Sequence, residues 1–385
     1  MRSLFEPMLR EHHNSQSDHI WIVQPEERSN FYSDPEGRFS VISADDADVH
    51  QFLGMDAYSA ANAFVSGKFS IRGDLFSAIR FFSSQPHSGI RPLLLSTLLR
   101  LRHLTNGLSV GNKRAAAHNI QFHYDRSNEF YTNFLDSRLL YSAAHFSDPE
   151  ETLDEAQVEK LERICRALVL RSDERFLDIG CGWGGLITYA AAHFGVTAEG
   201  CTLSERQLEF ANQTARRENV EDQVTVHLRD YRDLDGRFDK VASVGMFEHV
   251  GRSRLATYFK KIHSLLDRHG LFLNRGIVRP QGVSDDLETL FLQKNVFPGG
   301  ELLHLDEVVR EGERAGFEVV AMEDFRVDYA LTCRAWTRNL QKRADNCMRL
   351  VGESTYRTWL LYLAASTVSF EDGLTGAAQV LFAKR

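Results

Sequence analysis

A glycine-rich run near the middle of the chain carries the residues best suited to binding a cofactor. The stretch Phe176-Leu-Asp-Ile-Gly-Cys-Gly-Trp-Gly-Gly185 reads as a short apolar strand ending at Asp178, followed by a loop that contains Gly180, Gly182 and Gly184. Glycine allows a sharp turn and lets a ligand approach main-chain atoms that a Cβ atom would shield. With a helix predicted over residues 186–194, the run predicts a strand–loop–helix unit that binds a nucleotide-like ligand in a doubly wound α/β fold.

Polar side chains follow the next two predicted strands, at the sheet edge where such folds bind their ligands. Thr202 and Gln207 follow the second strand, and their neutral groups suit ribose hydroxyls. Asp230 follows the third strand and is a suitable acceptor for an adenine amino group. Taken alone, Thr202 and Gln207 are equally explained by a turn and the start of a helix. Combined with the glycine loop and Asp230, they predict a site for an adenosine-type ligand.

Alternating strand and helix patterns surround these residues and must bring them together. Strands are predicted at 175–179, 196–202, 224–228, 240–244 and 271–277, with a last strand at 379–384. Helices are predicted at 153–168, 204–218 and 254–266, the first with Thr152 as N-cap and Glu155 at capping-box spacing. The alternation predicts an α/β fold class with a doubly wound, mainly parallel sheet and a smaller N-terminal α+β domain.

The length of 385 residues suggests two domains. Residues 1–105 are predicted to form the small α+β domain, with strands at 20–23 and 39–42 and a helix at 56–65. Residues 106–118 are interpreted as a linker, and residues 119–385 as the larger domain. The leucine-rich segment 92–104 predicts a helix with a wide apolar face. That helix either packs on the protein body or lies at a phospholipid surface.

Charge and cysteine content exclude several functional classes. A net charge of −8 and a pI near 6.0 argue against nucleic acid as a partner. The five cysteines are scattered without Cys-x-x-Cys spacing, so neither a zinc site nor a disulfide framework is indicated, and a reduced cytoplasmic setting is expected. No apolar run reaches the roughly 18 residues of a membrane span, so any lipid contact is expected to be peripheral.

Six sequence blocks give the larger domain a family resemblance. The glycine loop resembles motif I of class I S-adenosylmethionine methyltransferases. The whole set, in order and at family spacing, resembles the cyclopropane-fatty-acyl-phospholipid synthases and the related mycolic acid methyltransferases. The blocks are His123–Tyr131, Leu140–Phe146, Leu177–Gly185, Thr202–Gln207, Asp230–Leu234 and Ser243–Gly251. The N-terminal third is also similar in length to the small sterol-carrier-like domain of the bacterial cyclopropane synthases.

The resemblance implies transfer of a methyl group from S-adenosylmethionine to an unactivated carbon–carbon double bond. Such a site needs no protein nucleophile, but must exclude water, stabilise positive charge and accept a proton. It implies that Glu248 lies beside the reacting centre and Tyr329 near the reacting carbon; the rival interpretations are a helix-start acid and a buried structural tyrosine. The resemblance places four further residues at or near the cofactor: Tyr124, Tyr141, Ser142 and His249.

Two residues depart from the family pattern. In the bacterial synthases a bound bicarbonate is thought to be the base, held in part by a cysteine and a histidine. Ala143 stands at the cysteine position and Arg275 at the histidine position. An alanine side chain cannot hydrogen-bond an anion, whereas an arginine adds a fixed positive charge. Three outcomes stay open: bicarbonate held by Arg275, a different base such as Glu248 or Tyr329, or failure of ring closure.

The resemblance thus implies a C-methyltransferase acting on unsaturated fatty acyl chains, most simply within phospholipids. The expected product carries a cyclopropane or a methylene or methyl branch. One alternative is methylation of another alkene, of isoprenoid type; the other is a non-catalytic lipid-binding homologue. The resemblance also implies a cytoplasmic protein, peripherally associated with the inner face of the membrane, and a homodimer.

Overall fold

The computed structural model describes residues 31–44, 48–85, 127–148, 150–283, 291, 295–296 and 301–385. Several predictions fall outside these residues: the strand at 20–23, the apolar helix at 92–104, the linker at 106–118 and the cofactor contact at Tyr124. The described residues form two sheets, one of three strands and one of seven.

The smaller sheet is antiparallel, in the order β1 (Phe31–Ser33), β2 (Phe39–Ser43), β3 (Phe69–Gly73). Three helices accompany it: α2 (His50–Leu53), α3 (Ala57–Val65) and α4 (Leu75–Ser83). Asp56 and Asp74 begin the two longer helices, because each carboxylate accepts a hydrogen bond from an otherwise unpaired N–H of the first turn. We refer to residues 31–44 and 48–85 as the small β-sheet unit.

The larger sheet has the order β6-β5-β4-β7-β8-β10-β9 and confirms the predicted doubly wound α/β class. Neighbouring strands from β6 to β8 run parallel, whereas β10 is antiparallel to both β8 and β9. The strands are β4 (Arg175–Ile179), β5 (Thr197–Thr202), β6 (Val224–Leu228), β7 (Phe238–Val244), β8 (Leu266–Val278), β9 (Phe317–Asp324) and β10 (Gly376–Lys384). The chain reverses its direction across the sheet between β4 and β7, so the glycine loop after β4 lies at the topological switch point.

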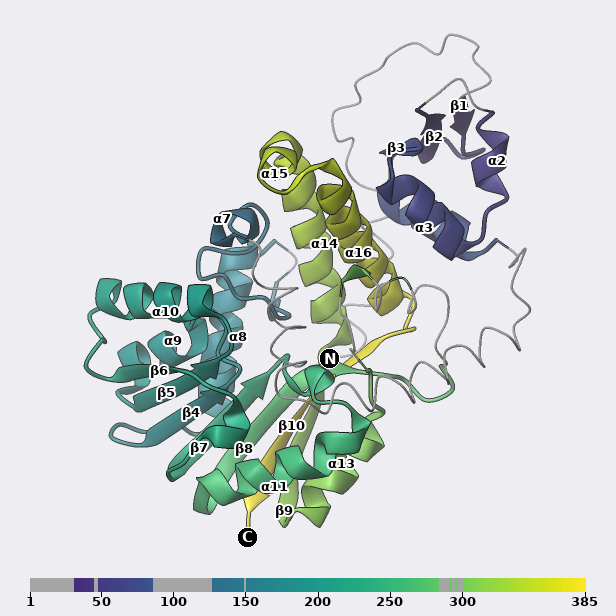
Figure 1. Cartoon of the computed structure of the whole chain (residues 1–385). Helices are drawn as coiled ribbons and strands as arrows, with labels where there is room; N and C mark the ends of the chain where they lie inside the picture. The colour runs from purple at the N-terminus through teal and green to yellow at the C-terminus, as the bar shows by residue number, and fades with distance from the viewer. Residues whose placement is uncertain are drawn as a thin grey trace.

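The central strands bury consecutive residues, and so side chains on both faces, as at 176–179 of β4 and 272–276 of β8. In β4, Phe176 packs in one hydrophobic core and Leu177 in another, and adjacent residues of β8 and β10 divide in the same way. Helices α8 (Leu153–Ala167), α9 (Gly185–Phe194) and α10 (Glu205–Arg217) lie beside β4–β6 (Figure 1). Helices α11 (Leu255–Leu265) and α13 (Leu305–Arg314) lie beside β8–β10. The predicted capping box of Thr152 and Glu155 begins α8.

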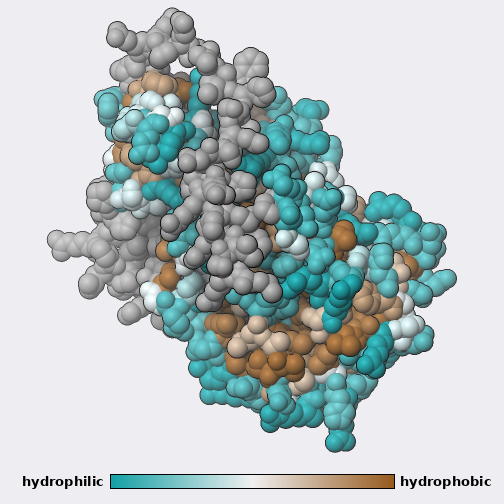
Figure 2. All heavy atoms as spheres, turned by 180° about the vertical axis from the view of Figure 1, so that it is seen from behind, coloured by the Kyte–Doolittle hydropathy of each residue, from teal (hydrophilic) through white to brown (hydrophobic). Residues whose placement is uncertain are grey.

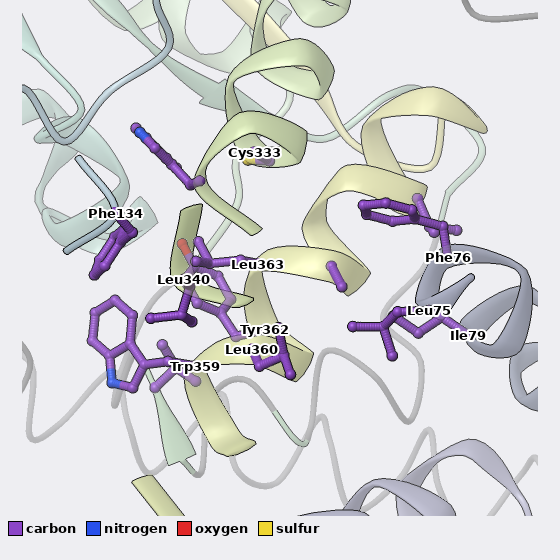
Figure 3. Close-up of a cluster of buried hydrophobic side chains, with 14 of the residues drawn as sticks. Leu75, Phe76, Ile79, Phe134, Cys333, Leu340, Trp359, Leu360, Tyr362 and Leu363 are labelled. Carbon is purple, nitrogen blue, oxygen red and sulfur yellow. The ribbon is translucent and has the colours of Figure 1, made fainter. Parts of the chain in front are cut away.

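Three helices near the C-terminus were not predicted from the sequence: α14 (Arg326–Lys342), α15 (Ala344–Val351) and α16 (Glu353–Glu371). They lie between the larger sheet and the small β-sheet unit (Figure 1). A single hydrophobic core joins side chains of α14 and α16 to those of the small unit. Figure 3 shows Leu75, Phe76 and Ile79 of α4 pointing across to α16, with Phe134 and Trp359 on its other side.

Polar contacts also attach the small β-sheet unit to α16. Arg357 donates to the carbonyl oxygens of Phe64 and Phe69, at 3.2 and 3.0 Å. Arg80 of α4 pairs with Glu371 at 2.6 Å. The small unit is therefore held to the C-terminal helices by both apolar packing and hydrogen bonds.

The surface of the larger part is not uniformly polar. Seen from behind, apolar side chains gather in a band across its lower half (Figure 2). Val320 and Met322 on β9 are among the most exposed large apolar side chains, at 55% and 59%. Among the described residues, no helix combines the length and apolar character that crossing a membrane requires.

Candidate active site

A cavity opens beyond the carboxyl ends of β4, β5 and β7, where the sequence predicted a ligand. Most of the predicted cofactor residues line it: Tyr141, Ser142, Asp178, Gly180, Gly182, Thr202, Gln207, Asp230 and His249. They come from segments far apart in sequence, and the parallel strands bring their C-terminal ends together at one edge. In the described part of the chain, no group of three or more His, Cys, Asp or Glu side chains is placed to hold a metal ion.

The three glycines of the loop serve different purposes. All have positive φ, at +79° for Gly180, +54° for Gly182 and +82° for Gly184, a region that other residues rarely adopt. A Cβ on Gly182 would meet no atom of the described residues within 4 Å, so this glycine borders open cavity space. A Cβ on Gly184 would lie 2.6 Å from the Cβ of Ala211, so Gly184 instead permits close packing of α9 on α10.

Asp178, at the end of β4, is a buried acid beneath the glycine loop. Its Oδ1 atom has no hydrogen-bond partner among the described residues. Burial raises the pKa of Asp178 to about 7, although the nearby Lys160 opposes the shift. An unpaired buried oxygen at the cavity wall is suited to a hydrogen bond from a polar ligand.

Lys160 and Gln157 on α8 are site residues that the sequence analysis missed. Lys160 is buried and lines the cavity, and its Nζ donates to Ser142 Oγ at 3.0 Å. Gln157 donates to the carbonyl oxygens of Leu140 and Ser142, both at 3.1 Å. Burial lowers the pKa of Lys160 to about 7. The two side chains therefore fix the 140–142 segment over the cavity, and their three-residue spacing on a buried helix face was the available signal.

Thr202 and Gln207 are hydrogen-bonded to each other beside the cavity. The Thr202 hydroxyl donates to Gln207 Oε1 at 2.5 Å, and both side chains are buried. The main-chain N–H of Ser204 donates to Thr202 Oγ1 and so orients the hydroxyl. This arrangement leaves neutral groups facing the ligand, as the sequence predicted for ribose hydroxyls.

Asp230 lies at the cavity edge with its carboxylate already engaged. Arg232 donates through Nε and Nη2 to the two Asp230 oxygens, at 2.7 and 2.6 Å. The main-chain N–H of Arg232 also donates to Oδ1, so Arg232 fixes the carboxylate at the cavity edge, where the sequence predicted an acceptor for an adenine amino group.

Glu248 lies on a short 3-10 helix, η2 (Phe247–His249). It is not among the residues that line the cavity, but its sequence neighbours Met246 and His249 are. Its Oε1 atom accepts the main-chain N–H of Ile277 at 2.7 Å. Gly276 makes room for it, since a Cβ there would lie 2.5 Å from Oε1. The Oε2 atom has no partner among the residues that the structure describes, and burial raises the pKa of Glu248 to about 7. The buried carboxyl is thus able to hold a proton or release it near neutral pH.

The neighbouring His249 lines the cavity, and burial lowers its pKa to about 4. The imidazole is therefore neutral at physiological pH and adds no positive charge where a carbocation would form.

Arg275 and Ala143, the two departures from the family pattern, are in direct contact. Arg275 Nη2 donates to the carbonyl oxygens of Ala143 and Ala144, at 3.4 and 3.5 Å. Its Nη1 donates to Gln379 at 3.1 Å, and the guanidinium lies 3.6 Å from the centre of the Phe325 ring. Burial lowers the pKa of Arg275 to about 10. The guanidinium therefore bonds three protein oxygens, while its Nε atom has no hydrogen-bond partner among the described residues. Ala143 carries no side-chain donor at the position where the family has a cysteine.

Tyr329, on α14, is buried between two aromatic rings. It stacks on Phe370 at 4.4 Å, nearly parallel, and on Phe325 at 6.1 Å. Tyr329 lies close enough to Arg275 to influence its pKa. Glu248 and Tyr329 are both buried, as a water-excluding site requires.

A cluster of aromatic rings adjoins the cavity, and the sequence analysis did not anticipate it. Tyr131 lies 4.9 Å from Trp183, and Tyr141 lies 5.1 Å from Trp336. Trp359 of α16 also packs against Tyr131, at 5.5 Å. Tyr141 and Trp183 line the cavity itself. Aromatic faces carry partial negative charge and attract cations, including the sulfonium of S-adenosylmethionine.

The doubly wound sheet with a glycine loop at its switch point is that of the class I S-adenosylmethionine methyltransferases. The cyclopropane synthase MmaA2 from Mycobacterium tuberculosis superposes with a TM-score of 0.67 and 29% identity, covering 70% of this chain and 98% of that chain. The mycolic acid cyclopropane synthase CmaA1, solved in complex with SAH and CTAB, matches with the same TM-score, identity and coverage.

The family model described as mycolic acid cyclopropane synthetase matches residues 111–380, and the chain belongs to that family. A probable fatty acid methyltransferase from Pseudomonas putida is 40% identical over 84% of this chain and 81% of that protein. A probable fatty acid methyltransferase from Mycobacterium tuberculosis is 39% identical over 71% of this chain and 64% of that protein. The sphingolipid C9-methyltransferase of Komagataella phaffii is 28% identical over 83% of this chain and 68% of that protein. The family resemblance is confirmed, and the chain is an S-adenosylmethionine-dependent methyltransferase of the cyclopropane synthase type.

The residues of the cavity fit S-adenosylmethionine. Gly182 leaves open the space that a side chain would fill, and Asp178 presents an unpaired oxygen. Bound there, the cofactor supplies an electrophilic methyl group on a sulfonium centre.

Proposed function

We propose that the protein transfers a methyl group from S-adenosylmethionine to the double bond of an unsaturated fatty acyl chain in a phospholipid. One observation carries the proposal: a buried Glu248 with an unpaired oxygen lies beside a cofactor cavity walled by aromatic rings. An alkene needs no activating nucleophile, but its carbocation needs a dry, electron-rich site and a proton acceptor. Relatives named as fatty acid methyltransferases, and a related structure with the amphiphile CTAB, support a lipid substrate.

In the proposed reaction the π electrons of the alkene form the new bond to the methyl carbon. The bond between that carbon and the sulfonium sulfur breaks, and its electron pair stays on sulfur. The resulting carbocation lies between the aromatic rings, and Glu248 accepts the proton that neutralises it. A proton lost from the new methyl group closes a cyclopropane. A proton lost from the carbon bearing that methyl group restores a double bond on a methyl-branched chain.

We propose the branched product, because the contact between Arg275 and the Ala143 segment occupies the place of the family's anion ligands. We take Glu248 rather than Tyr329 as the base, because the Oε2 atom of Glu248 has no partner among the described residues, whereas Tyr329 is stacked between two aromatic rings. No step in this scheme runs through bicarbonate.

A sphingolipid is the second candidate substrate, since several relatives are named sphingolipid C9-methyltransferases. An unsaturated acyl chain or long-chain base of a sphingolipid would react by the same alkene chemistry.

We also propose that the protein works at the membrane surface through its N-terminal domain, residues 1–105, joined by the linker 106–118 to residues 119–385. A homodimer remains an expectation.

Mass spectrometry of lipids from cells that express the protein and receive labelled methionine tests the proposal. The expected result is a labelled methyl branch on an unsaturated phospholipid acyl chain. A Glu248→Gln variant should give no labelled lipid, yet bind S-adenosylmethionine with nearly unchanged affinity by calorimetry. Label in a ring would overturn the branched product, label in sphingolipid would favour the second candidate, and no labelled lipid would refute the function.

A further inference from the structure

A second cavity lies between the small β-sheet unit and α16, apart from the cofactor cavity. Its walls come from α3, β3 and α4 on one side and from α16 on the other. The lining residues are Ala57, Ala60, Ala61, Phe64, Phe69, Ile71, Ile79, Phe82, Ser83, Phe291, Leu361, Tyr362 and Ala365. Neither the cofactor nor the catalytic step proposed above uses this cavity.

The cavity is lined almost entirely by carbon. Its inner wall is formed by buried rings, including Phe64, Phe69 and Phe82. Alanines face each other across it, with Ala57 and Ala61 one turn apart on α3 and Ala365 on α16, and their short side chains leave the space open. Among the described lining residues none carries a charge, and the only polar side-chain groups are the hydroxyls of Ser83 and Tyr362. Such a lining repels a polar ligand and suits a hydrocarbon chain.

Tyr362 connects this cavity to the active site. Its ring lines the apolar cavity, and its hydroxyl lies 3.4 Å from the hydroxyl of Tyr141. Tyr141 in turn lines the cofactor cavity. Figure 3 shows Tyr362 on α16, between the side chains of α4 on one side and Phe134 on the other. The hydrogen-bonded pair Tyr141–Tyr362 therefore connects the wall of one cavity to the wall of the other.

We propose that this second cavity receives the methyl-terminal end of the substrate's acyl chain while the double bond lies in the active site. The inference rests on the proposed function, and it assigns the small β-sheet unit a direct part in substrate binding. A chain that passes the Tyr141–Tyr362 pair would exchange water for apolar contacts along its tail. The depth of the cavity would then select the length of chain beyond the double bond.

Substrates that differ only beyond the double bond test the proposal. Phosphatidylglycerol vesicles carrying myristoleoyl, palmitoleoyl or oleoyl chains share the double-bond position and differ only in tail length. An Ala61→Phe or Ala365→Phe variant should lose activity on oleoyl vesicles by roughly ten- to hundredfold, equivalent to about 1–3 kcal/mol of overpacking. Activity on myristoleoyl vesicles should fall much less. Asn62→Phe is the matched control, since Asn62 is also half-buried on α3 but does not line the cavity.

The outcomes separate this inference from the proposed function. Wild-type protein that methylates none of the vesicles refutes the function itself. Wild-type activity combined with the same chain-length profile in Ala61→Phe, Ala365→Phe and Asn62→Phe overturns the second cavity alone. If the variants fail to fold, photocrosslinking of wild-type protein tests the proposal, with an oleoyl lipid that carries a diazirine at its methyl end. Crosslinks to α3, α4 or 361–365 support the proposal, and crosslinks confined to other segments contradict it.

Discussion

Burial raises the pKa of Glu248 towards neutral pH, and the same burial lowers the stability of the folded protein when the carboxyl is ionised. The carboxyl keeps its proton up to about pH 7 in the folded protein, because the charged form would be desolvated. The unfolded chain releases that proton near the ordinary glutamate pKa of about 4.3. Between these values the folded state binds more protons, so the free energy of unfolding falls as pH rises. A base that works near neutral pH is thus obtained at the expense of stability.

Replacing Glu248 by glutamine should remove that dependence. The neutral amide still accepts the Ile277 N–H but does not titrate. In cofactor-free protein, the variant should match wild type near pH 4.5 and exceed it above pH 7 by up to about 3 kcal/mol. Urea unfolding of both proteins at pH 5 and pH 8 measures the difference. Asp178 titrates in both proteins, so its contribution cancels from the difference between their free energies of unfolding. If that difference were the same at pH 5 and pH 8, Glu248 would not be the buried group that holds a proton.

Gly182 should be required for cofactor binding because a side chain there fills cavity space. Gly182→Val should weaken S-adenosylmethionine binding by roughly ten- to hundredfold in calorimetry, equivalent to about 1–3 kcal/mol. The positive φ also costs stability, about 1–2 kcal/mol. Gly373→Val is the matched control, since Gly373 has φ +75° and equally open surroundings among the described residues, and does not line the cavity. Similar losses of affinity in both variants would show that strain, not occupied space, is responsible.

Individual residues could be predicted where the backbone dictates their role. Thr202, Gln207 and Asp230 follow strand ends, so their place at the cavity edge follows from sheet topology. Trp359 belongs to a helix whose packing partners lie far away in sequence, so no local pattern pointed to it. For Lys160 the three-residue spacing from Gln157 on α8 was a local signal that the sequence analysis did not use. The contact between Arg275 and Ala143 likewise joins positions 132 residues apart. It needed the fold to bring them together.

At the scale of elements, we expect β8 and the 139–146 segment to influence the reaction's outcome together. Arg275 extends from β8 to the carbonyl oxygens of that segment, so the altered pair is one structural unit. The segment is held from its other side by Gln157 and Lys160 of α8. A change in either element therefore alters the site that accepts the proton.

Restoring both family residues tests this coupling. The double variant Ala143→Cys with Arg275→His should make turnover depend on added bicarbonate and should raise the fraction of ring product. Arg275→His alone leaves two carbonyl groups and Gln379 without their donor, which should cost about 1–3 kcal/mol of stability. Product analysis by mass spectrometry with and without bicarbonate makes the comparison, with both single variants as controls. An unchanged product and no bicarbonate response would refute a drifted anion site.

Elements with a clear period were predictable, and those without one were not. Strands β4 and β6 have the predicted bounds. Four of the five residues of β4 are buried, whereas β6 is an edge strand that was recognised by its β-branched Val-Thr-Val run. The edge strand β9 was missed, since it is half exposed and carries Glu318, Glu323 and Asp324. Helix α16 packs on both the small unit and α14, so apolar residues surround it and no single amphipathic face marks it.

At the scale of the whole molecule, α16 is the element that unites the two sheets. It contributes Trp359 to the aromatic cluster beside the active site, and Leu361 and Ala365 to the second cavity. It also carries Arg357, which bonds the main chain of α3 and β3. Docking of the small β-sheet unit is therefore linked to the wall of the active site through one helix.

Weakening the contact between the small β-sheet unit and α16 should lower the rate of lipid methylation without changing the affinity for S-adenosylmethionine. Arg357→Met removes the two hydrogen bonds from Arg357 to the Phe64 and Phe69 carbonyl oxygens, a loss of about 1–3 kcal/mol, although the Phe64 oxygen still accepts the N–H of Gly67. Amide hydrogen exchange in α3, β3 and α4 should therefore accelerate by roughly five- to hundredfold, while the central strands β4 and β7 keep their protection. Arg349→Met, on the exposed face of α15, is the control. Because the second cavity would lose one wall, methylation of oleoyl vesicles should fall in Arg357→Met, whereas S-adenosylmethionine affinity stays unchanged. Equal acceleration in β4 and β7 would instead show that the small unit and the larger sheet open as one cooperative body, and would contradict a separate effect of Arg357 on the small unit.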